Sequence, residues 1–244
     1  MIKFHIITIF PEMFSSYLNE SIVGRALKNK LIEVKFYNPR DFTRPSEAFK
    51  RRRGKDNGYR PVDDKPYGGG PGMVMRAEPM LKAIEYALRK CSRSGFPTTQ
   101  RQPFARTLSK RSRIKIINFS PSGKKFNTAY AKNSVKKYTD IILISGRYEG
   151  IDMRVKKIFK AEDISIGDYV LTGGELPAMV LIDSISRQIP RVLGKYESLE
   201  EERVSSSEVY TRPEVLKYKN KNYKVPKVLL SGNHKKIEEW KKNR

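Results

Sequence analysis

Short runs of β-branched and apolar residues alternate with helical patterns along the first three quarters of the sequence. The strand-like runs are Lys3–Phe10, Ile32–Tyr37, Ile114–Phe119, Asp140–Ser145 and Asp163–Ile166. The helical patterns fall near Ser21–Lys30, Pro79–Lys90, Thr128–Lys137 and Pro177–Gln188. Strands that alternate with helices pair in parallel, so the sequence predicts an α/β fold built on a parallel sheet.

Three glycine-containing segments follow predicted strands and indicate where a ligand would bind. SPSG begins at Ser120, SGRYEG begins at Ser145, and SIGDYVLTGGE begins at Ser165. Ligands of parallel α/β sheets bind beyond the carboxyl ends of the strands. We therefore expect the three segments to converge on one pocket.

The richest glycine cluster is PYGGGPGM, Pro66 to Met73. Glycines allow positive φ and a close backbone approach to a ligand or to another chain segment. A phosphate-binding P-loop ends in Gly-Lys-Ser/Thr, which this cluster lacks, and the chain has no G-x-G-x-x-G between a strand and a helix. These absences argue against an NTPase or a dinucleotide fold, and leave a tight turn as the alternative to a ligand-binding role.

Composition excludes several other classes of protein. The longest apolar runs are strand-length, well short of the roughly 20 residues that span a bilayer, and the N-terminus lacks a signal-peptide cleavage site. We expect a cytoplasmic protein with no membrane segment. The chain has one cysteine, Cys91, and two histidines, His5 and His234, which are too few for a Cys/His zinc cluster. We therefore exclude a structural zinc site and predict no metal-binding residues.

The chain is strongly basic, with 50 Lys and Arg against 26 Asp and Glu and a formal charge of +24. This charge favours a nucleic acid partner, although a general basic bias or a ribosome-associated role would also produce it. The segment from Arg89 to Lys115 holds nine basic residues and no acidic one, and Lys50 to Arg60 is similar. We interpret both as surface insertions. Their basic side chains either contact phosphates or are exposed only to solvent.

These patterns divide the chain into three parts. Residues 1–190 form the predicted α/β domain, with basic insertions near 44–60 and 93–113. Residues 191–209 are polar and acidic and read as an interdomain linker. Residues 210–244 carry basic residues interleaved with Tyr218, Tyr223 and Trp240, a combination suited to binding RNA. These residues are too few to fold alone and must pack against another part of the protein or a partner.

Six sequence strings, in order and over nearly the whole chain, resemble the bacterial tRNA (guanine-N1)-methyltransferases that modify position 37, the base 3′ of the anticodon. The strings are TIFPEMF (Thr8 to Phe14), VDDKPYGGGPGM (Val62 to Met73), SGRYEGID (Ser145 to Asp152), SIGDYVLTGGELPAM (Ser165 to Met179), YTRPE (Tyr210 to Glu214) and VLLSGNH (Val228 to His234). Each alone could arise by chance, whereas six in order make the resemblance specific.

The resemblance implies a SPOUT-class α/β domain with a deep C-terminal trefoil knot, an obligate homodimer, and a small helical C-terminal domain that helps to hold tRNA. The methyl donor is S-adenosyl-L-methionine, and the resemblance leaves open whether Mg²⁺ assists. The donor-binding positions carried over from the family are Ser120, Pro121, Gly146, Tyr148, Glu149, Gly150, Ser165, Ile166, Gly167, Tyr169, Leu171, Gly173, Gly174 and Pro177. They lie on the three segments already singled out.

These residue types suit an adenosine-like ligand. Glycine backbone groups can read the adenine edge, while Ile166, Leu171 and Pro177 supply an apolar seat. Glu149 is the carboxylate expected nearest the cationic sulfonium. The alternative for Glu149 is an ion pair with Arg147 or Arg154.

Methylation of guanine N1 requires removal of the N1 proton, and a carboxylate is a suitable base. The family uses an aspartate in the linker, and the matching position here is Glu202, with Glu201 as the alternative. By the same resemblance Arg187 stabilises the negative charge that develops on guanine O6. An Asp183–Arg187 salt bridge within one helix is the structural alternative, and both arrangements could hold together.

The chain departs from the family pattern at two places outside the linker. Ser122 stands where glutamine usually follows the Ser-Pro pair, and the chain stops soon after Trp240, whereas many relatives continue with a basic tail. Even with these departures, the resemblance implies methylation of guanine N1 at position 37 of tRNA, with a related knot-class methyltransferase acting on another RNA base or on ribose as the alternative. We expect the linker carboxylate of one subunit to meet the donor bound by the other.

Overall fold

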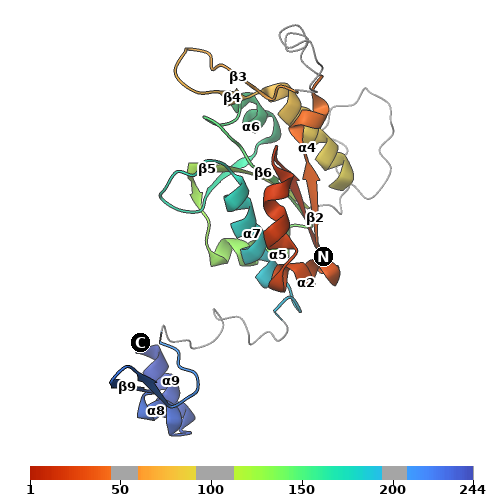
Figure 1. Cartoon of the computed structure of the whole chain (residues 1–244). Helices are drawn as coiled ribbons and strands as arrows, with labels where there is room; N and C mark the ends of the chain where they lie inside the picture. The colour runs from red at the N-terminus through yellow and green to blue at the C-terminus, as the bar shows by residue number, and fades with distance from the viewer. Residues whose placement is uncertain (45–59, 92–112, 194–207, 244) are drawn as a thin grey trace. The chain divides into compact units, whose positions relative to one another are not determined.

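The computed structural model describes residues 1–44, 60–91, 113–193 and 208–243. The chain divides into two compact units, Met1–Val192 and Leu193–Arg244 (Figure 1). Within the described residues, no helix combines the length and the apolar character needed to cross a membrane.

A parallel sheet of five strands forms the centre of the first unit. Its strands are β1 (Ile2–Ile7), β2 (Ile32–Tyr37), β5 (Ile114–Lys125), β6 (Asp140–Ile144) and β7 (Glu162–Ser165), in the order β2-β1-β6-β5-β7. Every pair in the sheet is parallel. The predicted fold class, α/β with a parallel central sheet, is therefore confirmed.

Helices cover both faces of this sheet. They are α1 (Ser15–Leu18), α2 (Ser21–Lys28), α4 (Ala77–Cys91), α5 (Thr128–Lys137), α6 (Met153–Phe159) and α7 (Glu175–Arg187). Ile141 and Leu143 of β6 pack in a core with α2, α5 and α7, whereas Ile142 and Ile144 pack in a second core with α4 and α6. Because successive side chains of a strand point to opposite faces, the central strand β6 is buried along its whole length.

Short-range hydrogen bonds fix where the helices begin. The Asn127 side chain accepts a hydrogen bond from the Tyr130 backbone N–H at 2.9 Å and caps α5. Asp152 does the same for α6 through the Arg154 N–H, also at 2.9 Å. Helix α6 ends at Phe159, and the left-handed backbone of the next residue, Lys160 (φ 49°), turns the chain toward β7. Such caps satisfy backbone donors that a helix leaves free at its first turn.

The strand and helix positions follow the sequence pattern closely, apart from the ends of several elements, the length of β5 and the presence of α6. Strand β2 and helix α5 have the predicted bounds, and the other predicted elements differ by a few residues at their ends. Strand β5 continues to Lys125 past the predicted end at Phe119. Helix α6 was not predicted because its seven residues are too few for a clear period. Short elements also complete the unit: η1 (Pro11–Phe14), η2 (Pro39–Phe42), β3 (Asp63–Asp64) and β4 (Val74–Met75).

The second unit contains a β-hairpin as well as helices. Strands β8 (Val215–Tyr218) and β9 (Lys221–Lys224) pair antiparallel, and α8 (Lys227–Leu230) and α9 (His234–Lys242) follow. The Asn233 side chain caps α9 by accepting a hydrogen bond from the Lys236 N–H at 3.2 Å. The family resemblance implied a helical domain here and did not predict the hairpin.

Candidate active site

A pocket of about 390 Å³ opens beyond the carboxyl ends of β5, β6 and β7, as expected for a parallel sheet. Its lining comprises Asn118, Phe119, Ser120, Pro121, Gly146, Arg147, Tyr148, Glu149, Gly150, Ile151, Met153, Lys156, Ile164, Ser165, Ile166, Gly167, Tyr169, Val170, Leu171, Thr172, Gly173, Gly174 and Pro177. Its volume lies in the range of small-molecule sites. The three glycine-containing segments therefore do converge on one pocket.

The loop after β6 crosses the segment that leads into α7 at very short range. Ser145 donates a hydrogen bond from Oγ to the Gly174 carbonyl at 3.2 Å, and the Gly174 N–H donates to the Gly146 carbonyl at 2.9 Å. A Cβ at Gly174 would lie 2.7 Å from the Cα of Ser145. Only glycine permits this approach, so Gly174 holds the two sides of the pocket together.

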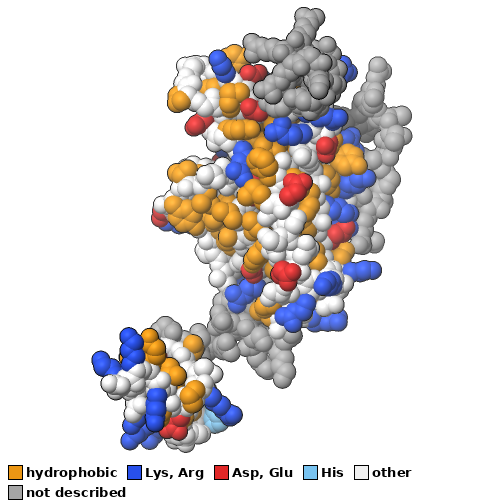
Figure 2. Space-filling view, viewed as in Figure 1, with side chains coloured by type: hydrophobic (Ala, Val, Ile, Leu, Met, Phe, Trp, Pro, Cys, Tyr) orange, Lys and Arg blue, Asp and Glu red, His pale blue; other side chains and the backbone are white. Residues whose placement is uncertain are grey.

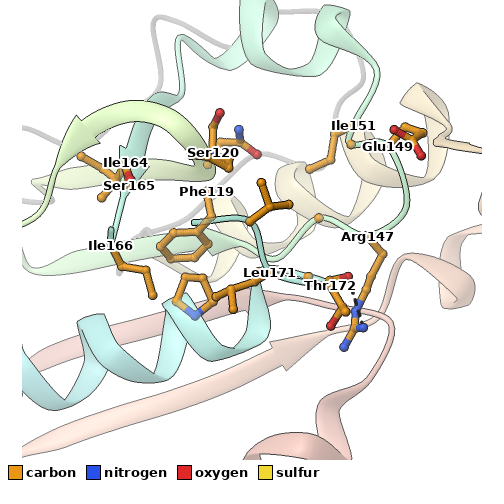
Figure 3. Close-up of a pocket in the computed structure, with 18 of the residues that line it drawn as sticks. Phe119, Ser120, Arg147, Glu149, Ile151, Ile164, Ser165, Ile166, Leu171 and Thr172 are labelled. Atoms are coloured by element: carbon orange, nitrogen blue, oxygen red, sulfur yellow. Dashed lines mark hydrogen bonds between the residues drawn. The ribbon is translucent and has the colours of Figure 1, made fainter. Parts of the chain in front are cut away.

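The loop within β5 leaves the sheet and returns to it. The pairing of β5 with β7 shifts register between Phe119 and Lys124. Of the residues between them, Ser120 and Pro121 line the pocket. Gly123 allows the return, since a Cβ there would lie 2.6 Å from the backbone carbonyl carbon of Asp163. In Figure 3 the Phe119 ring lies between Ile166 and Leu171, so the three side chains make an apolar wall.

A buried ion pair supports the loop from behind. Glu175, 1% exposed, accepts a hydrogen bond from Thr8 Oγ1 at 2.9 Å and lies 2.9 Å from Arg147 Nε. Arg147 also donates to the Thr172 carbonyl at 3.4 Å (Figure 3), and its guanidinium lies 4.9 Å from the centre of the Phe10 ring. One carboxylate thus joins the end of β1, the loop after β6 and the start of α7.

The PYGGGPGM segment backs the pocket rather than forming a phosphate loop. The Glu149 N–H donates to the Met73 carbonyl at 3.0 Å, and the Met75 N–H donates to the Gly150 carbonyl at 2.9 Å. A Cβ at Gly72, where φ is 84°, would lie 2.7 Å from Glu149 Cγ. The segment is a turn between β3 and β4, and its last glycine makes room for the Glu149 side chain.

Both arginines weighed as partners for Glu149 have other partners. Arg147 pairs with Glu175, and Arg154 pairs with Asp152 at 2.6 Å. The hydrogen bond from Arg154 holds the pKa of Asp152 below its ordinary value. Glu149 projects from the same loop as Arg147 but in a different direction (Figure 3).

All fourteen residues predicted to bind the donor line this pocket. Nine further lining residues were missed: Asn118, Phe119, Arg147, Ile151, Met153, Lys156, Ile164, Val170 and Thr172. Most adjoin the quoted motifs and could have been found as their neighbours. Lys156 could not, because it lies on a helix that the sequence pattern did not predict.

The two residues predicted to be catalytic are placed differently. Glu202, like its alternative Glu201, lies outside the described residues. Arg187 is the last residue of α7 and does not line the pocket, which meets the first turn of that helix. On the same helix Asp183 accepts a hydrogen bond from the Tyr17 hydroxyl, and burial together with this bond raises the pKa of Tyr17 to about 12.

Comparison with known proteins agrees with this geometry. A family model described as "tRNA (Guanine-1)-methyltransferase TrmD" matches residues 2–244. The chain belongs to this family. Three relatives, each named tRNA (guanine-N(1)-)-methyltransferase, come from Clostridioides difficile (43% identical, covering 98% of this chain and 90% of the relative), Buchnera aphidicola subsp. Acyrthosiphon pisum (42%, 99% and 88%) and Dictyoglomus turgidum (43%, 99% and 84%).

Membership of the TrmD family makes this chain a methyltransferase, and the family implies S-adenosylmethionine as the methyl donor. The pocket fits such a donor in two respects. Chain segments cross at glycines beside the pocket, where backbone N–H and C=O groups can lie close to a ligand. The apolar wall of the pocket suits the flat face of an adenine.

Proposed function

We propose that this enzyme methylates N1 of guanine at position 37 of tRNA. The observation that carries the proposal is the convergence of all fourteen family positions on one pocket of suitable size at the carboxyl edge of the sheet. The family assignment over residues 2–244 supports this reaction, and the pocket supports our assignment of the donor site.

The donor, when bound, supplies an electrophilic methyl group on a sulfonium centre. Phe119, Ile166 and Leu171 would hold its adenine between apolar side chains, and backbone groups of Gly146 and Gly174 lie at the crossing beside it. Glu149 lines the pocket with a carboxylate that favours a cation. We assign Glu149 to the sulfonium side of the pocket on this chemistry.

The guanine must lose its N1 proton before N1 can attack the methyl group. We assign this proton to Glu202, with Glu201 as the second candidate, and we assign stabilisation of the negative charge on O6 to Arg187. The proton leaves guanine as its N1 lone pair becomes the nucleophile. A cationic side chain near O6 lowers the energy of that anion.

Arg187 reaches a pocket most simply in a homodimer. It lies twelve residues beyond Glu175 on α7, which is roughly 18 Å along a helix and places it far from its own pocket. Leu176, Val180 and Asp183 share its helix face, and Leu176 and Val180 are 49% and 44% exposed. An exposed apolar stripe that ends in a functional arginine fits contact with a second copy, whose pocket Arg187 would complete.

We further propose that the loops around the pocket form the trefoil knot of the SPOUT class. The close crossing of the Ser145–Gly146 and Gly173–Gly174 segments supports this proposal, as does the backbone bridge between Arg147 and Gly173. A knotted arrangement would hold both segments without a disulfide.

The second unit is proposed to bind tRNA. From Lys217 to Arg244 the sequence holds ten basic residues, and Tyr210 packs near Trp240 with ring centres 6.4 Å apart. Basic groups contact phosphates, and exposed aromatic rings can stack on bases. A tRNA substrate supports a cytoplasmic location for this enzyme.

The test is methyl transfer from labelled S-adenosylmethionine to a tRNA transcript with guanine at position 37, beside a transcript with adenine there. We expect product only with guanine, identified as N1-methylguanosine, and its loss in Glu202→Gln while Glu201→Gln retains activity. Equal labelling of both transcripts would instead indicate another base or the ribose as the target. Intact tRNA binding without any transfer would contradict the proposed activity.

A further inference from the structure

A second cluster of reactive side chains lies inside the first unit, away from the pocket. His5 comes from β1, Asp140 is the first residue of β6, and Cys91 is the last residue of α4. Their exposures are 0%, 5% and 4%. Because the pocket follows the last residue of β6, this cluster lies toward the opposite end of that strand, on the face that α4 covers.

The donor atoms of the three side chains are close enough to share one ion. His5 Nε2 lies 3.1 Å from Asp140 Oδ1 and 3.4 Å from Cys91 Sγ, and all three ligand atoms lie within 4.8 Å of one another. Zinc binds nitrogen and oxygen at about 2.0–2.2 Å and sulfur at about 2.3 Å, so tetrahedral ligand atoms are roughly 3.3–3.6 Å apart. The separations of His5 Nε2 from Asp140 Oδ1 and from Cys91 Sγ, 3.1 and 3.4 Å, are close to these values.

We infer that His5, Cys91 and Asp140 form a site for a divalent cation that accepts sulfur and nitrogen ligands, with Zn²⁺ as the physiological ion. The thiol and imidazole argue against Mg²⁺ and Ca²⁺, which prefer oxygen ligands. The three side chains leave the fourth position of a tetrahedral ion to another ligand such as water.

Neighbouring residues are placed to orient two of the three ligands. Tyr37 OH lies 2.8 Å from His5 Nδ1, and the Thr139 hydroxyl donates to Asp140 Oδ2 at 2.7 Å. Metal-binding histidines typically engage their second ring nitrogen in this way, which fixes the ring and leaves Nε2 for the ion. The partners of Nδ1 and Oδ2 thus leave Nε2 and Oδ1 directed at each other and at Cys91.

The charges of the cluster favour a divalent ion. A divalent ion would displace the thiol proton to solvent, and its two charges would balance one thiolate and one carboxylate.

A count of residue types in the sequence does not reveal this cluster. That count considered only cysteine and histidine, of which the chain has too few for a zinc cluster. The fold supplies a carboxylate, Asp140, that lies 49 positions from Cys91 and 135 from His5 in the numbering. An ion held there would join β1, β6 and α4 and would stabilise the folded state as any selective ligand does.

The experiment is a titration of the untagged, chelator-treated full chain with Co²⁺, monitored by absorbance. Because Cys91 is the only cysteine, a cobalt–thiolate charge-transfer band can arise from no other side chain of this protein. We expect one Co²⁺ per chain, displacement of the band by Zn²⁺, and a higher midpoint temperature of unfolding with Zn²⁺.

Three variants separate this site from adventitious binding. Cys91→Ala should abolish the band, and Asp140→Asn should weaken Co²⁺ binding by at least about tenfold, whereas His234→Ala should bind as the unmodified chain does. Circular dichroism and binding of S-adenosylhomocysteine check that each variant is folded. Absence of the band in the unmodified chain would overturn the inference. A band that Asp140→Asn leaves unchanged would also overturn it, since the ion would then sit on the thiol alone.

Discussion

Glu175 shows how one buried residue sets the shape of the pocket. Its carboxylate lies between Thr8 and Arg147, and Arg147 is 17% exposed. Removing one partner of a buried ion pair leaves the other charge without compensation, which costs about 3–5 kcal/mol in full burial. Because Arg147 keeps some contact with solvent, we expect Glu175→Gln to lower the free energy of unfolding by about 2–3 kcal/mol.

The same change should weaken S-adenosylhomocysteine binding, since Arg147 belongs to the pocket wall. Urea unfolding and calorimetric binding measure the two effects. The matched control is Glu78→Gln, which removes an exposed ion pair to Lys82 at 2.6 Å and should lower the free energy of unfolding far less, because solvent screens that pair. Equal losses in the two variants would show that burial does not set the strength of the Glu175 pair.

At this scale the sequence predicted the pocket lining well and the supporting contacts poorly. Gly146, Tyr148 and Gly174 could be named because they belong to motifs. The pairing of Thr8 with Glu175 could not, because the two residues are 167 positions apart and only the fold brings them together. Motifs thus locate ligand-facing residues, whereas buried partners depend on tertiary packing.

Among the elements, β5 has the most direct effect on the site. Its predicted end at Phe119 is where the ladder to β7 is interrupted, and the strand resumes at Lys124. The sequence pattern ended there because Ser120, Pro121 and Gly123 are poor strand formers. The structure shows that this break is local and that it places Ser120 and Pro121 on the pocket.

Gly123 is therefore predicted to be intolerant of a side chain. In Gly123→Ala the new Cβ would collide with the backbone of β7 at Asp163 and Ile164, and overpacking of this kind costs about 1–3 kcal/mol. We expect reduced stability in urea together with weaker S-adenosylhomocysteine binding. Ser122→Ala in the same loop loses only a hydrogen bond to Ser120 and should change both by far less. Unchanged ligand affinity in Gly123→Ala would show that the conformation of this loop does not determine ligand binding in the pocket.

For the whole molecule, a net charge of +24 is the property that sequence reveals most directly and structure explains least. The charge is spread over both described units, and Figure 2 shows Lys and Arg side chains on each of them. Its role depends on where the tRNA phosphates lie, which no pattern within the chain encodes. A salt series can measure that role without a structure of the complex.

Each phosphate contact that is lost should reduce the slope of log affinity against log salt by about 0.9 in magnitude for duplex regions of the tRNA. We therefore expect replacement of the exposed Lys235, Lys236 and Lys242 of α9 by glutamine to weaken tRNA binding and flatten that slope. Neutralising the basic residues of Lys50–Arg60 and Arg93–Arg113 should act in the same direction. Affinity for S-adenosylhomocysteine should stay unchanged in both variants, because the proposed role of these cations is contact with tRNA phosphates and not with the donor. A variant with the slope of the unmodified chain at every salt concentration would show that its cations make no phosphate contact, and that tRNA binding depends on the remaining positive charge.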